Sequence, residues 1–250
     1  MMREWTIRPL HVGTLHRKRS SFLYMNGNTE PLDVPVIMFL LESGDTRVLV
    51  DTGCDDPAIA QPDHHPFDRT LEQHPLNALR AAGVDPESIS LVVNTHLHWD
   101  HCYGNNLFPS ARFVVQREEL RYAVAPLPCH LNAYDSFLIG RTPPWATTRF
   151  DPLDGDTELM DGLALMLTPG HTPGLQTVLV EAESGRYLLP SDNVPLYENW
   201  KGKPPHWPHI PDTHHCNLAD YFETYRKMEA TGGRVLPSHD FRILETPIYK

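Results

Sequence analysis

The stretch Thr95-His96-Leu97-His98-Trp99-Asp100-His101 decides how this chain of 250 residues is interpreted. It follows Leu91-Val92-Val93, an apolar β-branched run typical of a buried strand, so three histidines and a carboxylate lie where a strand ends and a loop begins. Neutral imidazole nitrogens bind zinc well, and a carboxylate beside them suits a second, oxygen-richer ion. The stretch therefore predicts the floor of a two-metal hydrolytic site.

Three later segments each bring one further candidate ligand to the end of an expected strand, beside a residue that turns the chain. They are His171 in TPGHTPG, Asp192 in PSDN and His239 in PSHD. Five histidines and two aspartates could complete two catalytic zinc sites and leave room for water. The candidate metal ligands are His96, His98, Asp100, His101, His171, Asp192 and His239.

The order HxHxDH, His, Asp, His resembles that of the metallo-β-lactamase superfamily. The spacing, the length and the segment Asp51-Thr52-Gly53 are most similar to the N-acyl homoserine lactonase family, from about Val34 to His239. This resemblance implies an α/β fold, a four-layer αββα sandwich of two mixed β-sheets with helices outside and the metals at one edge. It also implies that Asp51 lies behind the ligands and orients them.

The same resemblance implies how the ligands divide between two Zn²⁺ ions per chain. One ion would take His96, His98 and His171, the other would take Asp100, His101 and His239, and Asp192 would bridge them. The implied activity is that of a dizinc metallohydrolase. A hydroxide held between the ions would attack a small-molecule lactone similar to an N-acyl homoserine lactone, with Asp100 as the proton shuttle.

Two related families fit this sequence less well. Flavodiiron members of the superfamily usually have a carboxylate where His98 stands here, so the histidine favours hydrolysis over redox chemistry. Glyoxalase II shares HxHxDH but adds a helical C-terminal region, whereas about eleven residues follow His239 in this chain.

One departure from the lactonase pattern leaves the substrate open. These enzymes commonly have a tyrosine three residues after the bridging aspartate, and that position is Pro195 here. We take Tyr197 as the candidate catalytic residue that hydrogen-bonds the substrate, although it could equally be a packed tyrosine. The sequence is also compatible with a hydrolase of another small electrophile (an isothiocyanate, thioester or other ester) and with a metal-binding sensor without turnover.

The charge of the chain limits the kinds of molecule that it can bind. The 21 basic and 32 acidic residues give a formal charge of -11, which disfavours binding to nucleic acid and to anionic membranes. The N-terminus lacks the order of a secretory signal, and no apolar run reaches the roughly 20 residues of a membrane span. We therefore expect a cytoplasmic protein with a small-molecule substrate, folded as one domain over residues 1–250, and leave a homodimer open.

The chain outside the ligand segments divides into expected elements and expected loops. The expected strands are 34–41 paired with 47–51, then 112–116, 164–167, 176–181, 186–189 and 234–236. Helices are expected from Leu71 to a stop at Gly83, over 117–125, and after an N-cap at Asn217 with Leu218, Phe222, Tyr225 and Met228 on one face. Two loops, 54–68 and 126–156, are expected to shape the pocket, and 195–216 is expected to form a lid.

Several histidines and cysteines invite a metal role that we do not assign. His64 and His65 are interpreted as part of a solvated loop or pocket rim. The four cysteines show no CxxC spacing and are expected to stay reduced, with Cys54 and Cys102 interpreted as small buried thiols near the metals.

Overall fold

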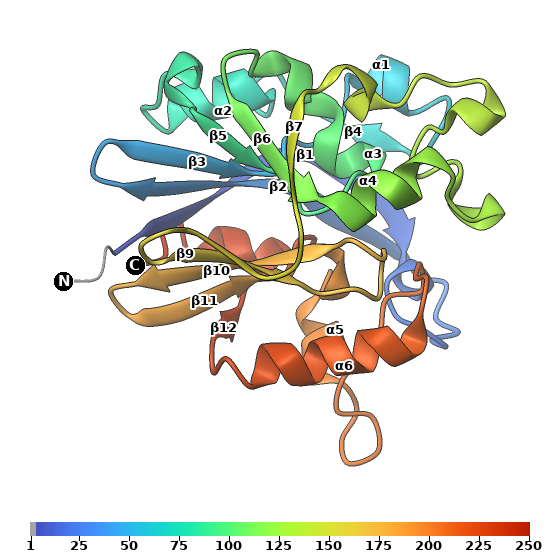
Figure 1. Cartoon of the computed structure of the whole chain (residues 1–250). Helices are drawn as coiled ribbons and strands as arrows, with labels where there is room; N and C mark the ends of the chain where they lie inside the picture. The colour runs from blue at the N-terminus through green and yellow to red at the C-terminus, as the bar shows by residue number, and fades with distance from the viewer. Residues whose placement is uncertain (1–3) are drawn as a thin grey trace.

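Two mixed β-sheets lie face to face in the computed structural model, which describes residues 4–250 (Figure 1). The strands of the first sheet, in spatial order, are β4 (Phe67–Asp68), β1 (Thr6–Lys18), β2 (Pro31–Ser43), β3 (Thr46–Val50), β5 (Leu91–Val93), β6 (Arg112–Gln116) and β7 (Phe150–Leu153). Those of the second are β12 (Arg234–Val235), β11 (Gly185–Leu189), β10 (Gln176–Ala182), β9 (Leu163–Leu167) and β8 (Thr157–Met160). Both sheets combine antiparallel pairs with parallel pairs, the latter joining β3, β5, β6 and β7 in the first sheet and β11 to β12 in the second.

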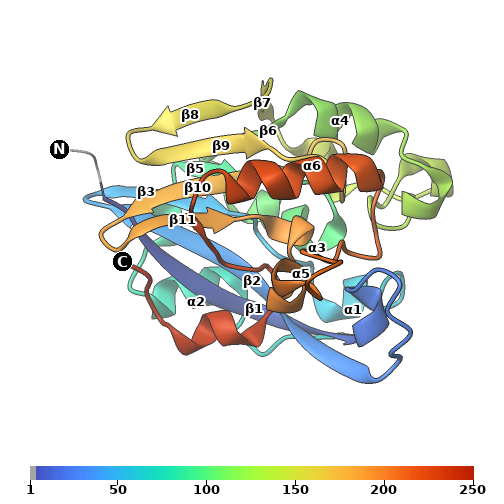
Figure 2. The same ribbon diagram turned by 90° about the horizontal axis from the view of Figure 1, so that it is seen from below.

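Helices cover the outer face of each sheet. They are α1 (Pro57–Ala60), α2 (Pro75–Ala81), α3 (Trp99–Cys102), α4 (Arg117–Val124), α5 (Tyr197–Lys201) and α6 (Leu218–Glu229). The first four lie on the side of the first sheet, and α6 runs across the second sheet (Figures 1 and 2). The expected four-layer αββα sandwich is confirmed. None of the described helices is long and apolar enough to cross a membrane.

Strand β2 shows why the sheets stack. Val36, Met38 and Leu40 pack into the cluster beneath α2, whereas Ile37 and Phe39 pack into the cluster between the two sheets. Successive side chains of a strand point to opposite faces, so an unbroken apolar run is stable only where both faces are covered. A third cluster joins the second sheet to the buried face of α6.

Most of the expected elements are confirmed, with shifted ends. The 34–41 and 47–51 pairing exists as β2 and β3, and Asn217 caps α6 by accepting bonds from the backbone N–H groups of Ala219 and Asp220. The helix expected from Leu71 instead begins at Pro75, and Leu71 is 76% exposed. Proline suits the first helical turn because its missing N–H has no intrahelical partner there.

Strand β1 was not predicted, although its 13 residues form one of the longest strands. Its pairing with β2 shifts register between His11 and Gly13. Gly13 adopts φ +146°, and a Cβ there would lie 2.3 Å from the Phe67 ring, so only glycine fits this position. The bulge interrupts the alternation of apolar and polar residues by which a strand is recognised in a sequence.

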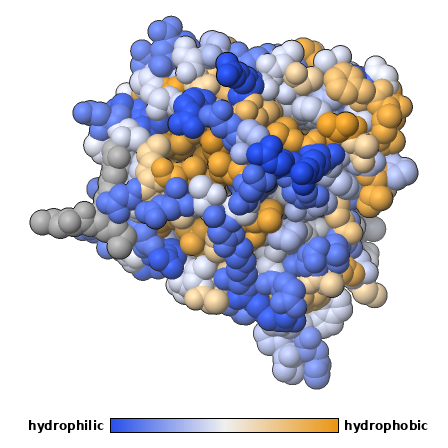
Figure 3. Space-filling model, in the orientation of Figure 1, coloured by the Kyte–Doolittle hydropathy of each residue, from blue (hydrophilic) through white to orange (hydrophobic). Residues whose placement is uncertain are grey.

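The three segments expected as loops are more ordered than the sequence suggested. Segment 54–68 holds α1 and β4, and 126–156 holds three short 3₁₀ helices and β7. Segment 126–156 also exposes Phe137, Leu138 and Ile139, and apolar side chains gather at the right of Figure 3, where this segment lies.

The expected lid at 195–216 is largely packed against the body of the protein. The buried amide of Asn199 donates to the carbonyls of Phe22 and Ile210, and only the tip from Lys203 to Pro208 is exposed throughout. That the segment acts as a lid stays a prediction.

Candidate metal centre

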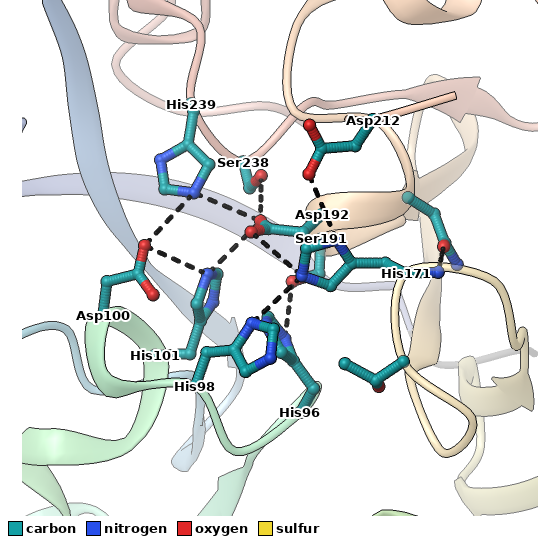
Figure 4. A network of polar contacts seen from close by, with 12 residues as sticks. His96, His98, Asp100, His101, His171, Ser191, Asp192, Asp212, Ser238 and His239 are labelled. Atoms are coloured by element: carbon teal, nitrogen blue, oxygen red, sulfur yellow. Dashed lines mark hydrogen bonds and ion pairs between the residues drawn. The ribbon is translucent and has the colours of Figure 1, made fainter. Parts of the chain in front are cut away.

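The seven predicted ligands converge at one edge of the sandwich, where four segments end or follow strands (Figure 4). They form two groups, within each of which one nitrogen or oxygen of every residue lies within 4.8 Å of the others. The groups are His96, His98 and His171, and Asp100, His101, Asp192 and His239. We call these seven residues the cluster.

Asp51 lies behind the cluster, as expected. Its buried carboxylate accepts hydrogen bonds from the Thr95 backbone N–H at 2.8 Å and from His101 Nδ1 at 2.8 Å. Asp51 itself adopts φ +60°, in the left-handed region. These bonds fix the loop after β5 and leave His101 Nε2 facing the other cluster residues.

Further bonds orient the remaining members. His239 Nδ1 donates to the Pro35 carbonyl at 2.9 Å, so its Nε2 faces Asp192 at 3.1 Å. Ser238 donates to Asp192 Oδ1 at 2.8 Å, and His171 Nδ1 lies 3.2 Å from a carboxylate oxygen of Asp212. In each of these contacts a group outside the cluster fixes the orientation of a side chain that belongs to the cluster.

The donor atoms suit a metal. Nε2 of His96 and of His98 is buried and has no hydrogen-bond partner within residues 4–250. An unpaired buried polar atom costs about 1–3 kcal/mol. A metal ion accepts these lone pairs, and imidazole with carboxylate is a common zinc donor set, so the residues present fit zinc.

The electrostatics favour the metal-binding protonation states of His96, His98 and Asp192. Burial, reinforced by neighbouring imidazoles, holds the pKa of His96 and of His98 well below the ordinary histidine value, so both rings are neutral at pH 7. Although burial opposes ionisation of Asp192, His101 and His239 hold the pKa of that carboxyl well below its usual range. At His101 and His239 burial lowers the pKa, but the carboxylates of Asp192 and Asp100 outweigh burial and raise it, so these two rings lose a proton when a metal binds.

A cavity of about 200 Å³ opens over the cluster. Both expected pocket loops contribute to its lining, through His65 and through Cys129, Asn132 and Ala133. The remaining lining residues are Leu15, Arg17, Ser21, Phe22, His98, Trp99, Asp100, His171, Asp192, Asp212, His214 and His239.

The structure shows where the loop histidine His64 and the cysteines Cys54 and Cys102 lie. His64 is not solvated, because its ring stacks on Trp99 at 4.1 Å and its Nε2 lies 3.0 Å from the Asp135 carboxylate. Cys54 and Cys102 are buried thiols outside both ligand groups, and burial raises the pKa of each.

Tyr197 does not reach the cavity, so the prediction that it binds the substrate is corrected. It begins α5, and its ring packs beneath the guanidinium of Arg242, 4.7 Å from the ring centroid. It also contacts the core between the sheets, and burial raises its pKa to about 12. Tyr197 is therefore a packed tyrosine.

Sequence reasoning missed three charged residues near the cluster: Arg17, Glu119 and Asp212. The fully buried carboxylate of Glu119 accepts bonds from the Leu97 backbone N–H at 3.0 Å, from Tyr134 at 2.7 Å and from Thr172 at 2.6 Å. Glu119 thereby ties α4 to the two loops that carry His98 and His171. No motif marks these residues, because the sequence does not distinguish them from the charged residues of exposed surfaces.

The chain is similar in sequence to known proteins. The model of the metallo-beta-lactamase superfamily matches residues 33–239. An N-acyl homoserine lactonase of Bacillus sp is 33% identical over 188 residues, which cover 70% of either chain. The chain belongs to the metallo-β-lactamase superfamily, within its N-acyl homoserine lactonase family. It is accordingly a hydrolase of the EC 3.1.1 type.

A second relative is similar in sequence over most of this chain, and two solved structures share its fold. The N-acyl homoserine lactonase AttM of Azorhizobium caulinodans is 28% identical over 250 residues, covering 92% of this chain and 91% of that one. The fold also matches a crystal structure of a B. thuringiensis AiiA mutant with N-decanoyl-L-homoserine bound, with a TM-score of 0.79 at 23% identity over 98% and 96% of the two chains. AidC, a dizinc quorum-quenching lactonase, has a TM-score of 0.69 at 18% identity over 96% and 89%.

Proposed function

We propose that this protein is a zinc-dependent lactonase that opens the ring of a small-molecule lactone, with the cluster as the ligands of two zinc ions. The observation that carries the proposal is the convergence of the two ligand groups at the floor of one cavity. Relatives named N-acyl homoserine lactonase make N-acyl homoserine lactones the first candidate substrates.

Distances within the cluster support the division of ligands. His96, His98 and His171 would hold one ion, and Asp100, His101 and His239 the other. Asp192 suits a bridging role because its Oδ2 lies 3.7 Å from His171 Nε2, while its Oδ1 lies 3.3 Å from His101 Nε2. Two zinc ions here would lower the pKa of water and polarise the substrate carbonyl.

Asp100 is placed for proton transfer. It lines the cavity, is less buried than the other members of its group, and its Oδ2 lies 3.8 Å from His239 Nε2. In ring opening, the oxygen of water bonds to the carbonyl carbon and the ring C–O bond breaks. Asp100 carries one of the two protons of the water to the departing ring oxygen, and the other is released to solvent, so the product is a hydroxy carboxylate.

Hydrolysis of another small electrophile is the second candidate. The observation behind it is that the cavity lining, over residues 4–250, contains no tyrosine. Carbonyl recognition must then differ from that expected from the lactonase pattern at Pro195.

A substrate panel tests the proposal. Zinc-loaded protein is assayed with N-hexanoyl homoserine lactone, γ-butyrolactone, a thioester, a phosphoester, a β-lactam and an isothiocyanate. We expect a lactone to be hydrolysed with the highest kcat/KM. A thioester, phosphoester or isothiocyanate that is hydrolysed faster than every lactone would replace the proposal with the second candidate, and no turnover of any compound would leave a metal-binding protein.

A further inference from the structure

Arg17 projects into the cavity from strand β1. Side chains alternate along a strand, and Leu15 and Arg17 both line the cavity, whereas His16 between them faces away and bonds the carboxylates of Asp33 and Asp68. The orientation of Arg17 is therefore set by the backbone of β1, which is paired with β2 through Lys18.

The guanidinium of Arg17 is half-buried, yet it makes no hydrogen bond or ion pair within residues 4–250. Its contact is with the Phe22 ring, whose centroid lies 5.9 Å away. Two other arginines near this end of the molecule are paired, Arg19 with Glu198 and Arg242 with Asp240. A guanidinium has five donors in a planar fork that fits a carboxylate, so Arg17 keeps that capacity for a molecule in the cavity.

The charges around the cavity leave Arg17 available to an external anion. Asp100, Asp192 and Asp212 line the same cavity and attract Arg17 at a range longer than an ion pair. Two of these carboxylates belong to the cluster, where zinc would neutralise their charge.

The rest of the lining is poorly suited to a long acyl chain. Binding sites for apolar ligands are mainly lined by apolar side chains. Here the apolar contribution comes from Leu15, Phe22, Trp99, Cys129 and Ala133. The other lining residues are charged or polar, and the cavity volume is about 200 Å³.

We propose that Arg17 binds a carboxylate of the substrate, and that this protein prefers compact lactones bearing a carboxylate to neutral lactones with an apolar acyl chain. This inference rests on the proposed lactonase function and narrows its substrate class. Ring opening by water then yields a hydroxy dicarboxylate, in which one carboxylate is formed at the cluster and the other lies against Arg17.

The experiment compares two lactones that differ by one carboxylate. Zinc-loaded protein is assayed with γ-butyrolactone and with γ-butyrolactone-γ-carboxylate, alongside N-hexanoyl homoserine lactone as the neutral substrate with an acyl chain. We expect the carboxylated lactone to have the highest kcat/KM, by about tenfold or more. Equal or higher kcat/KM on either neutral lactone would overturn the inference while leaving the lactonase function intact.

Variants then assign the preference to Arg17. Arg17→Met should lower kcat/KM on the carboxylated lactone by about ten- to hundredfold, mainly through KM, and should lower kcat/KM on γ-butyrolactone by a much smaller factor. For Arg17→Lys, kcat/KM on the carboxylated lactone should lie between the values of wild type and Arg17→Met, because lysine keeps the positive charge but lacks the planar fork of donors. Arg112→Met makes the same change of charge at an exposed residue paired with Asp151, and should behave as wild type. Equal losses on both lactones in Arg17→Met would contradict a carboxylate-binding role.

A binding measurement separates failure of this inference from failure of the lactonase function. Calorimetry compares 2-hydroxyglutarate and 4-hydroxybutyrate, the two ring-opened products, on zinc-loaded wild type and Arg17→Met. We expect tighter binding of the dicarboxylate to wild type and loss of that difference in Arg17→Met. If no lactone is turned over but this pattern appears, the lactonase function fails and the Arg17 site stands; if both products bind alike, the site fails.

Discussion

The two sides of the cavity are built in different ways. On one side, members of the cluster are buried and are held from behind by Asp51, the Pro35 carbonyl, Ser238 and Asp212. On the other side, the N-terminal wall, consisting of Leu15, Arg17, Ser21 and Phe22, carries an arginine that makes no hydrogen bond or ion pair within residues 4–250. The difference lies in the polar groups: those of the cluster are held by hydrogen bonds from outside it, whereas the one charged side chain of the N-terminal wall is positioned by its strand alone.

Asp100→Asn should have the largest effect, since it removes the proton carrier from the cluster. We expect the lactone hydrolysis rate to fall by about a hundredfold or more. Zinc content must be measured on the same sample, because the amide is also a weaker ligand. A full rate with full zinc occupancy would show that Asp100 carries no proton.

Asp212→Asn tests whether the contacts that hold the cluster from outside raise its affinity for zinc. Asp212 lies beside His171 Nδ1, and loss of such a partner typically lowers metal affinity by about ten- to hundredfold. Competition with a zinc chelator measures the affinity. Asp45→Asn, at an exposed turn, is the matched control, and equal zinc affinity in both variants would remove Asp212 from the account.

Glu119→Ala should act on stability. It leaves the Leu97 N–H and the hydroxyls of Tyr134 and Thr172 without their acceptor, at a cost of about 1–3 kcal/mol in the free energy of unfolding. Glu118→Ala, on the exposed side of the same helix, should change stability by no more than about 0.5 kcal/mol. Urea denaturation compares the two, and similar values would mean that Glu119 is not a structural tie.

Tyr197→Phe should have the smallest effect, because this hydroxyl lies outside the cavity. We expect kcat/KM on the best lactone to stay within about twofold of wild type, since the ring still packs beneath Arg242. A tenfold fall in kcat with unchanged stability would return Tyr197 to the catalytic site.

The cluster could be predicted from the sequence because chemistry and chain position coincide there. His96, His98, Asp100 and His101 follow an apolar run directly, and His171, Asp192 and His239 stand beside glycine, proline or serine where strands end. Strand ends meet at one edge of a sheet, so local patterns sufficed to bring distant ligands together.

The cavity wall and the supports could not be predicted in this way. Arg17 acquires its direction from β1, whose alternation is broken by the bulge at Gly13. Glu118 and Glu119 are identical in type and adjacent, and only the packing of α4 buries one of them. Tyr197 was wrongly assigned because nearness in sequence to Pro195 does not fix the direction in which a helical side chain points.

A zinc titration tests whether the cluster is a two-zinc hydrolytic site. Metal-free protein is titrated with zinc while hydrolysis of the best lactone is followed. We expect no hydrolysis without metal and a rate that rises to a plateau at about two zinc ions per chain, because the seven ligands exceed what one tetrahedral ion can use. A plateau at one ion per chain, or hydrolysis by the metal-free protein, would show that the cluster is not a two-zinc hydrolytic site.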